Sequence, residues 1–395
     1  MDRNMKQKTD KKHIALYLGG LRKGGAERVM VTLADHLYEA GWDVTFVTTY
    51  FTPPEFYPAH ASWDPKTGED IQQKEGIHRI YSDPSSNLLS ENRIRNFHVR
   101  FAVLRSIWKT ISPDLILSFI GINNIMAILT SAGLKIPVAV SVRANPPEEY
   151  NSKKLLIPAK ILFPIAAGVI LQTGPAAEFF PKAVQKKAVI LPNPLNPDFI
   201  RPLWRGERDR SIISIGRLDE NKNQKMLLEA FSMLRNSKDA NERRISEGWS
   251  IHLYGDGPLR ETLEQQAKQE GIIDQVCFEG IVTDVADRIM KASIYVLTSY
   301  TEGMPNALME SMALGLSCIA SDCPCGGAAE LIRNGENGFL VPVGSAEKLK
   351  EKLYLLMSDK ELAQNLGTEA SKVQANYNAG TVSRKWENYL EKLLR

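Results

Sequence analysis

Residues 302–315 read Glu-Gly-Met-Pro-Asn-Ala-Leu-Met-Glu-Ser-Met-Ala-Leu-Gly, and they decide the fold class of this chain. An apolar run, Ile294 to Ser299, precedes them, and a second apolar run, Ser317 to Ala320, follows them. This order predicts a strand, a loop, a helix and a strand, which is typical of α/β proteins. Proline suits the first helical turn, where its missing N–H is no loss, so the helix is predicted to begin near Pro305.

Two glutamates flank the predicted start of this helix. Glu302 lies in the loop before it, and Glu310 lies about 1.4 turns beyond Pro305. The unpaired N–H groups of a first helical turn and the helix dipole attract an anion. A diphosphate could therefore bind here, with Glu310 accepting hydrogen bonds from ribose hydroxyls and Glu302 facing a sugar. The alternative is an ordinary helix with one acidic residue before it and one on its solvated face.

Composition limits the classes of protein that the chain can belong to. A length of 395 residues with 43% hydrophobic residues suits two domains. Residues 1–205 carry 26 Lys and Arg against 18 Asp and Glu, whereas the remainder carries 23 against 28. The basic first half predicts an anionic partner, such as a membrane or a phosphorylated acceptor. No nucleic-acid motif is present, so nucleic acid is not expected. Because residues 1–12 are polar and basic, no signal peptide is expected, and the protein is predicted to stay in the cytoplasm.

The beginning of the chain predicts a parallel, doubly wound sheet. Residues 13–18 and 43–49 read as strands, and a glycine-rich loop and a helical run lie between them. Further strand-like runs recur up to residue 192. Gly24 and Gly25 open the first helix, where a phosphate or sugar could approach the backbone, although a tight turn without a ligand is the alternative. The glycines do not form G-x-G-x-x-G, so a nicotinamide site is not supported.

A proline-rich segment, residues 192–205, reads as the connection to a second domain that begins with an apolar run at Ser211. Gly216, Arg217 and Lys222 follow that run. Breaking a sugar–diphosphate bond puts charge on the departing diphosphate, and fixed cations or a metal can stabilise this charge. The sequence contains no Asp-x-Asp, so Arg217 and Lys222 are predicted to serve and no metal is expected. The alternative is a strand end followed by a solvated lysine.

These motifs resemble the retaining glycosyltransferases of family 4. The matching patterns are E-x7-E at Glu302 and Glu310, G-R-L-x-x-x-K at residues 216–222 and G-G-A-E-R at residues 24–28, and the resemblance spans nearly the whole chain. It implies the GT-B fold, an α/β architecture of two doubly wound, Rossmann-like domains that face a central cleft. The expected domains are an acceptor-binding domain over residues 1–205, a nucleotide-sugar-binding domain over 206–378, and a final helix over 379–395 that crosses back to the first domain.

The resemblance also assigns roles to residues. Glu302, Arg217 and Lys222 are the expected catalytic residues, with Glu302 positioning the sugar rather than attacking it. The expected donor-binding residues are Gly24, Gly25, Gly216, Arg217, Lys222, Gly303, Met304, Pro305, Asn306, Ala307 and Glu310. The expected donor is a nucleoside diphosphate sugar, with UDP as the expected nucleotide, and neither a cofactor nor a metal is expected.

The acceptor is expected on the first domain. In residues 92–109, apolar side chains follow helical spacing, and Arg93, Arg95 and Arg100 lie beside them. Arginines of this kind can bind a lipid-linked pyrophosphate, as in related enzymes, but a solvated surface helix is the alternative. Arg143 stands at a strand end where many family members have a histidine, and it is assigned to the acceptor site. Residues 153–167 are apolar with lysines, and they predict either an interfacial segment or a core helix.

Together these features predict a retaining transfer of a hexose or N-acetylhexosamine to a membrane lipid-linked or polysaccharide-precursor acceptor. The enzyme is expected to be peripheral on the cytoplasmic face of the inner membrane. Two alternatives remain, a nucleotide-sugar epimerase or hydrolase on the same fold, and a non-catalytic sugar-nucleotide-binding subunit.

Overall fold

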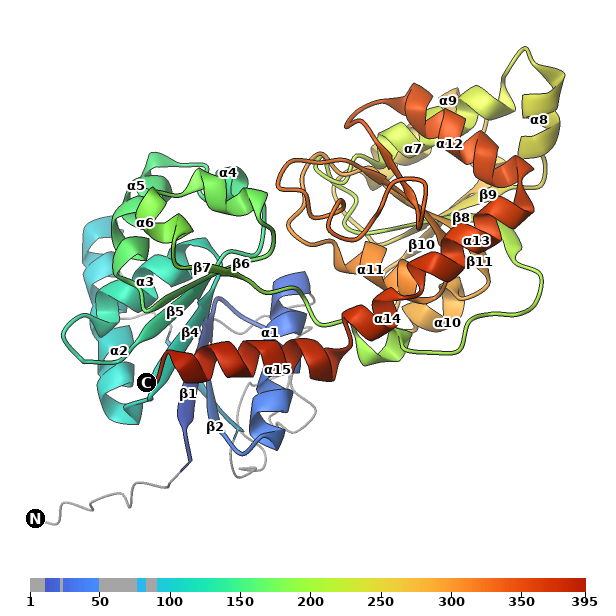
Figure 1. The fold of residues 1–395 in the computed structure, drawn as a ribbon. Coiled ribbons are helices and arrows are strands. Elements are labelled where there is room, and N and C mark those ends of the chain that lie inside the picture. Colours follow the sequence, from blue (N-terminus) through green and yellow to red (C-terminus); the bar gives the residue numbers. More distant parts are fainter. Residues whose placement is uncertain (1–10, 22–23, 50–76, 83–90) are drawn as a thin grey trace, which may run out of the picture. The chain divides into compact units, whose positions relative to one another are not determined.

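The computed structural model describes residues 11–21, 24–49, 77–82 and 91–395, and the chain divides into two compact units (Figure 1). The first unit holds residues up to 172, residues 176–194 and residues 380–395, and the second holds residues 173–175 and 195–379. The boundary predicted after residue 205 therefore falls within the second unit. The reason is that Leu195 and Phe199 are buried in the hydrophobic core of that unit.

The first unit is built on a parallel sheet. It has seven described strands, which lie in the spatial order β3-β2-β1-β4-β5-β6-β7. They are β1 (His13–Leu18), β2 (Asp43–Thr48), β3 (Ile77–Tyr81), β4 (Leu115–Phe119), β5 (Val138–Ser141), β6 (Gly168–Leu171) and β7 (Ala188–Ile190). Helices cover both faces of this sheet, as a doubly wound architecture requires (Figure 1).

The helical segments of the first unit connect these strands, and one of them comes from the end of the chain. They are α1 (Gly25–Glu39), α2 (Arg93–Ile111), α3 (Gly121–Ser131), α4 (Pro146–Glu149), α5 (Lys153–Leu162), η2 (Phe163–Ile165), η3 (Pro175–Phe179), α6 (Lys182–Gln185) and α15 (Ala379–Lys392). In α15, Trp386 is fully buried, its ring lies 5.8 Å from that of Phe119, and its Nε1 donates to the carbonyl oxygen of Pro192 at 3.1 Å. This packing ties the last helix to the first unit.

The second unit has the same kind of architecture. Its described strands lie in the order β10-β9-β8-β11-β12-β13, and neighbouring strands in this order run parallel. They are β8 (Asp209–Ile215), β9 (Ser250–Tyr254), β10 (Val276–Gly280), β11 (Ala292–Leu297), β12 (Ser317–Ser321) and β13 (Phe339–Val341). The α-helices are α7 (Gln224–Arg235), α8 (Ala240–Ser246), α9 (Arg260–Gln269), α10 (Val285–Ile289), α11 (Asn306–Ala313), α12 (Ala346–Ser358), α13 (Lys360–Ala370) and α14 (Val373–Asn376).

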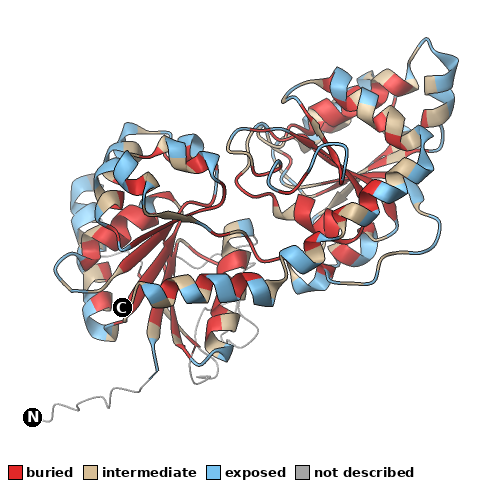
Figure 2. Ribbon diagram, in the orientation of Figure 1, coloured by how far each residue is buried: buried red, intermediate tan, exposed pale blue. Residues whose placement is uncertain are grey.

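Alternate residues of the second sheet point to two separate hydrophobic cores. Ile212 of β8 packs into a cluster with α7, α9 and α12, whereas the next residue, Ile213, packs into a cluster with α11. Burial on both faces explains why these strands are almost continuously apolar. In Figure 2 the strands of both units are largely buried, and the outer sides of the helices are exposed.

The two segments predicted to contact an acceptor or a membrane have exposed apolar side chains. In α2, Leu104 and Trp108 are buried, but Ile94 is 71% exposed and Phe97 is 44% exposed. The apolar side chains of α2 are therefore buried in the core only in the C-terminal half of the helix. Among the described residues, no helix combines the length and the apolar character needed to cross a bilayer.

Candidate functional site

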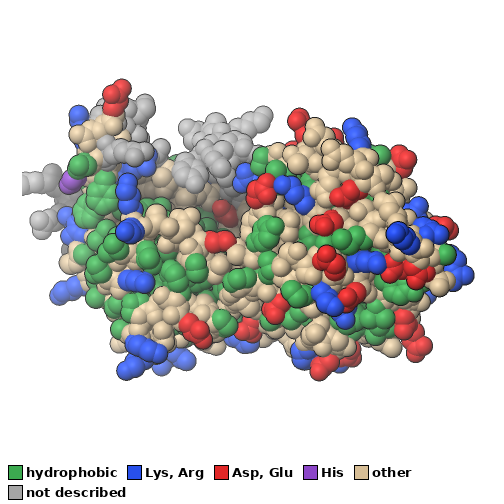
Figure 3. Space-filling view, turned by 90° about the horizontal axis from the view of Figure 1, so that it is seen from above, with side chains coloured by type: hydrophobic (Ala, Val, Ile, Leu, Met, Phe, Trp, Pro, Cys, Tyr) green, Lys and Arg blue, Asp and Glu red, His purple; other side chains and the backbone are tan. Residues whose placement is uncertain are grey.

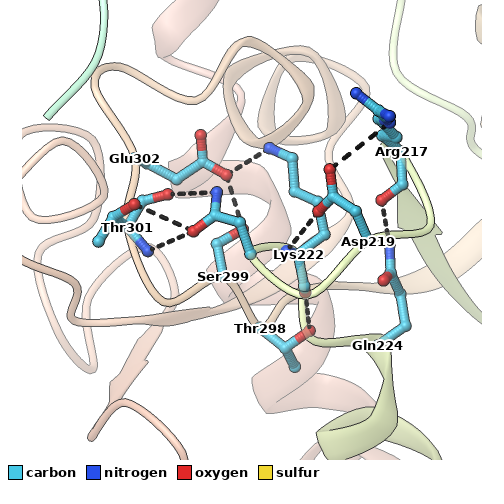
Figure 4. Close-up of polar contacts among 9 residues, drawn as sticks. Arg217, Asp219, Lys222, Gln224, Thr298, Ser299, Thr301 and Glu302 are labelled. Carbon is cyan, nitrogen blue, oxygen red and sulfur yellow. Dashed lines mark hydrogen bonds and ion pairs between the residues drawn. The ribbon is translucent and has the colours of Figure 1, made fainter. Parts of the chain in front are cut away.

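The candidate site of the second unit lies where two neighbouring parallel strands end. Strand β8 leads into the loop that carries Arg217 and Lys222, and strand β11 leads into the loop that carries Glu302. Because parallel strands point the same way, their following loops meet at one edge of the sheet. Residues far apart in the sequence are thereby brought into contact (Figure 4).

Lys222 and Glu302 form the ion pair at the centre of this site. Lys222 Nζ lies 2.5 Å from Glu302 Oε1, and the Ser299 hydroxyl donates to the same oxygen at 2.6 Å. The Lys222 side chain is 25% exposed and that of Glu302 is 12% exposed. The pair is therefore largely shielded, yet the ammonium remains accessible to an anion from solvent.

The backbone on both sides of this pair is fixed by hydrogen bonds. Lys222 N donates to Asp219 Oδ1 at 3.0 Å, and the hydroxyl of Thr298 donates to the carbonyl oxygen of Lys222 at 2.8 Å. Asn221 joins the two loops, because its Oδ1 accepts from both N and Oγ1 of Thr301 and its Nδ2 donates to the Thr301 carbonyl oxygen. Sequence motifs did not predict a role for Asn221, Ser299 or Thr301. Their positions at two adjacent strand ends are the signal that could have identified them.

Arg217 lies apart from this ion pair. Its side chain is 70% exposed, and its Nε lies 3.7 Å from Asp219 Oδ2, whereas Lys222 points to Glu302 (Figure 4). The structure therefore brings two of the three predicted catalytic side chains into direct contact. The guanidinium of Arg217 remains on the surface beside them.

Close backbone contacts hold the Glu302 loop in place. A Cβ atom added to Gly327 would lie 1.4 Å from the carbonyl oxygen of Gly303, so only glycine fits there. On the other side, a Cβ atom on Gly255 would lie 2.0 Å from the carbonyl oxygen of Gly216. These glycines let neighbouring loops pack directly against the two loops of the site.

Helix α11 begins at Asn306 with Pro305 at its N-cap, which confirms the predicted start. Gly303, Met304 and Ala307 belong to the loop and the first turn around this helix start. Glu310 lies within α11 and is 4% exposed, so it faces the interior rather than a solvated surface. The alternative of a plain exposed glutamate at this position is therefore wrong.

A cysteine lies beside the Glu302 loop, and a pocket opens nearby. Burial raises the pKa of the Cys323 thiol to about 12, and the charge of Glu302 adds to this shift. The thiol is therefore protonated and uncharged at neutral pH. A pocket of about 930 Å³ is lined by Tyr300, by residues 322–326 and by part of β13 with the residues after it. This volume falls within the range of known small-molecule sites.

The first unit has a pocket of its own, lined by both apolar and polar side chains. It measures about 540 Å³ and is lined by Gly19, Glu27, Asn96 and Arg100 among others. Gly24 is the N-cap of α1, and a Cβ atom on it would lie 2.0 Å from the Glu27 carboxylate. The helix N-terminus that was predicted to attract a phosphate thus has an acidic side chain of its own beside it. Gly24 and Gly25 as donor contacts remain a prediction.

The predicted acceptor arginines occupy different surroundings. Arg95 and Arg100 are exposed on α2, whose first turn is capped by Asn92 Oδ1, which accepts from two backbone N–H groups. The side chain of Arg93 lies outside the described part of the chain. By contrast, Arg105 caps α3, since its Nη1 donates to the carbonyl oxygens of Thr130 and Ala132, both at 2.8 Å.

Arg143 is buried rather than presented to solvent. It is 9% exposed, its guanidinium lies 4.8 Å from the Phe119 ring centroid and 5.4 Å from that of Trp386, and its Nη2 donates to Asn193 Oδ1. Burial lowers the pKa of Arg143 to about 9, and the charge of Glu149 partly opposes this shift. The guanidinium nevertheless stays charged at neutral pH and is stabilised by its aromatic and amide neighbours.

Comparison with known proteins agrees with this architecture. The family model described as Glycosyl transferases group 1 matches residues 198–373, and the model described as Glycosyltransferase Family 4 matches residues 23–207. The chain belongs to the family 4, or group 1, glycosyltransferases, and its fold is GT-B. It is therefore a transferase enzyme.

Relatives and solved structures cover almost the whole chain. A Campylobacter jejuni protein named GalNAc-alpha-(1->4)-GalNAc-alpha-(1->3)-diNAcBac-PP-undecaprenol alpha-1,4-N-acetyl-D-galactosaminyltransferase is 28% identical, over 94% of this chain and 96% of its own length. The amylovoran biosynthesis glycosyltransferase AmsD of Erwinia amylovora is 22% identical, over 96% and 99%. Among solved structures, Anabaena HepE in complex with UDP has a TM-score of 0.76 at 18% identity, with coverage of 96% of this chain and 100% of that one.

Proposed function

We propose that this enzyme transfers a hexose or N-acetylhexosamine, with retention of configuration, from a UDP-sugar to a lipid-linked or polysaccharide-precursor acceptor. The observation that carries the proposal is the shielded Lys222–Glu302 pair, which lies in the loops beside the start of α11. The complex of Anabaena HepE with UDP and the name of the Campylobacter relative, which includes PP-undecaprenol, support the choice of donor and acceptor.

In the proposed reaction, the bond between the sugar C1 and the diphosphate oxygen breaks, and a bond from an acceptor hydroxyl to C1 forms on the same face. The hydroxyl proton passes to the departing diphosphate. Lys222 and Arg217 stabilise the negative charge that grows on the diphosphate, and the N–H groups at the start of α11 add to this effect. Glu302 holds the sugar hydroxyls, and Glu310 holds the ribose. Each role needs only the side chains present, so no metal ion is required by this scheme.

The test is a panel of donors: UDP-glucose, UDP-galactose, their N-acetyl forms and GDP-mannose. Each is incubated with the purified enzyme and membrane extract, and the release of nucleoside diphosphate is followed. We expect one UDP-sugar to be consumed much faster when acceptor is added, and NMR of the product to show the anomeric configuration of the donor. Donor consumption that does not respond to acceptor would favour an epimerase or hydrolase. Donor binding without turnover on any acceptor would favour a binding subunit.

The acceptor is proposed to bind the first unit through α2. One turn of an α-helix takes 3.6 residues, so Arg100 lies on nearly the same side of α2 as Arg93, whereas Arg95 lies almost opposite. Arg100 also lines the pocket of about 540 Å³. Arg100 is therefore the described arginine suited to a pyrophosphate, and Arg95 is the matched control on the other side of the helix. Arg93 as an acceptor contact remains a prediction.

Peripheral binding to the cytoplasmic face of the membrane is part of the proposal. Ile157, Ile161 and Ile165 repeat every four residues along α5 and η2, and they are 53%, 64% and 70% exposed. Lysines 153, 154 and 160 belong to the same segment. Figure 3 shows hydrophobic side chains gathered among Lys and Arg side chains on the first unit. Exposed apolar side chains beside lysines suit the interface of an anionic bilayer.

Sedimentation with lipid vesicles tests this membrane contact. The wild-type enzyme should bind vesicles containing phosphatidylglycerol more strongly than vesicles of phosphatidylcholine alone. Replacing the three isoleucines by serine should lower the bound fraction at least severalfold. The control is Ile281→Ser, because Ile281 is 69% exposed but belongs to the second unit. Equal binding of all three proteins would rule out this surface.

A further inference from the structure

His252, Cys277 and Glu279 form a compact group of possible metal ligands on the second unit. One ligand atom from each residue lies within 4.8 Å of the other two. An imidazole nitrogen, a thiolate sulfur and a carboxylate oxygen are ligands that zinc accepts in proteins. In the part of the chain that the structure describes, this is the one group of at least three such side chains.

The sheet places these three side chains together. Strands β9 and β10 are parallel, and His252 and Cys277 are paired in their register. Glu279 follows Cys277 by two residues and lies at an irregularity in the pairing of β10 with β9, between Phe278 and Gly280, and its carboxylate contacts His252. The intervening Phe278 and the neighbours of His252, Ile251 and Leu253, pack on the opposite face. All three residues lie in strands, and backbone pairing fixes His252 and Cys277 opposite each other.

The contacts of His252 suit metal binding. Its Nδ1 lies 2.7 Å from Glu279 Oε1, and its Nε2 lies 3.0 Å from the Ser250 hydroxyl. The short contact between Nδ1 and Glu279 needs a proton between these two atoms. A metal ion would replace that proton, and Nε2 would then carry the proton of the ring and donate it to Ser250. A hydrogen bond to the far nitrogen is the usual way in which a protein orients a ligating histidine. His252 and Glu279 are each 25% exposed, so an ion can reach them from solvent.

We propose that His252, Cys277 and Glu279 bind Zn²⁺, with water at the fourth position. In a tetrahedral site with bonds of about 2.0–2.3 Å, ligand atoms lie roughly 3.6 Å apart. His252 Nδ1 and Glu279 Oε1, now 2.7 Å apart, would therefore move apart by about 1 Å, and any separation near the upper limit of 4.8 Å would shorten by about 1 Å. The ion would join edge strand β10 to β9. The proposal is independent of the transfer reaction, because none of these residues belongs to the loops of Lys222 and Glu302.

Metal titration of the full-length enzyme tests the site. After treatment with a chelator and its removal, Zn²⁺ is added in a calorimeter, and Co²⁺ is added as a spectroscopic probe. We expect one Zn²⁺ per chain, a thiolate-to-Co²⁺ charge-transfer band in the near ultraviolet, and a rise in melting temperature with Zn²⁺. Cys277→Ser should abolish the band, and both Cys277→Ser and Glu279→Gln should weaken Zn²⁺ binding at least tenfold.

The matched control is His36→Ala. His36 Nε2 lies 3.0 Å from Glu387 Oε2, so this pair resembles His252 and Glu279 but is not part of a three-ligand group among the described residues. Its loss should leave Zn²⁺ affinity and the Co²⁺ band unchanged. Because Glu279→Gln nearly preserves the shape of the side chain, it tests the site even if Cys277→Ser does not fold. Absence of the band in the wild type, or equal Zn²⁺ affinity in the wild type and both ligand variants, would overturn the proposal.

Discussion

Replacing Lys222 by alanine removes the cation that contacts Glu302 and that we expect to meet the donor diphosphate. Removing one partner of a buried ion pair typically costs about 3–5 kcal/mol of folding free energy. Here the Lys222 side chain is 25% exposed and solvent screens the remaining charge, so we expect a smaller cost, about 1–2 kcal/mol. This corresponds to a melting temperature lowered by a few degrees, and the enzyme should still fold.

The effect of Lys222→Ala on catalysis should be larger than its effect on folding. Loss of one preorganised group that stabilises a transition-state charge typically lowers kcat by about 100–1000-fold, or about 2.7–4 kcal/mol. Release of nucleoside diphosphate at saturating donor and acceptor measures this loss. The control is Lys225→Ala, because Lys225 lies in the first turn of α7 nearby and pairs with Glu220 instead, at 3.3 Å. The reasoning is refuted if Lys222→Ala stays within about threefold of the wild type, or if Lys225→Ala is equally impaired.

A double-mutant cycle measures the interaction between Lys222 and Glu302 separately from the effect of each residue alone. Glu302→Gln removes the carboxylate charge and nearly preserves the shape of the side chain. Because Lys222 and Glu302 touch, their effects should not add, and a coupling energy of about 0.5–3 kcal/mol is expected in kcat/KM. Simple additivity would mean that the two residues act separately during the reaction.

Four further changes test other parts of the structure. Asn221→Ala removes the side chain that joins the two site loops, so kcat/KM should fall about tenfold or more while circular dichroism stays unchanged; normal kinetics would contradict this role. Burial lowers the pKa of His13, so the unfolded chain binds a proton more readily than the folded chain, and stability should fall as the pH drops below about 6.5. His13→Gln should therefore lose less melting temperature than the wild type between pH 7.5 and 5.5. An equal loss in the two proteins would contradict this. Arg100→Ala should raise the KM for a lipid-linked acceptor about tenfold, whereas Arg95→Ala should change it less than threefold; the reverse order would exclude the proposed side of α2. Gly327→Ala forces a backbone shift at the Glu302 loop and should raise the donor KM severalfold, so an unchanged donor KM and melting temperature would show that the loop adapts freely.

Local sequence signals predicted the elements that build the site. Pro305 marked the start of α11, and the apolar runs around it marked β11 and β12, because these signals depend on neighbouring residues alone. The contact between Lys222 and Glu302 was not predicted, because it depends on the pairing of β8 with β11, which only the structure shows. Their roles in the reaction remain predictions.

Features that depend on tertiary packing could not be predicted in this way. The apolar spacing of α2 predicted a single core face, but Ile94 and Phe97 are exposed because the underlying packing involves only the C-terminal half of the helix. The segment that carries Ile157 and Ile161 was compatible with a core helix or an interfacial one, and only the structure shows these isoleucines to be exposed. Periodicity identifies the apolar side of a helix but not what covers it.

Arg143 shows most clearly how packing alters the meaning of a residue. At the end of a strand, an arginine suggests a ligand contact, because ligands bind at that edge of a doubly wound sheet. Here the guanidinium lies against Trp386 of the last helix, α15, and binds Asn193 of the segment that follows β7. With only 9% of its surface exposed, Arg143 can influence an acceptor mainly by holding these two elements in place. A lysine at this position would keep the charge but lose the planar stacking on Phe119 and Trp386, so the charge alone does not explain why the site holds an arginine.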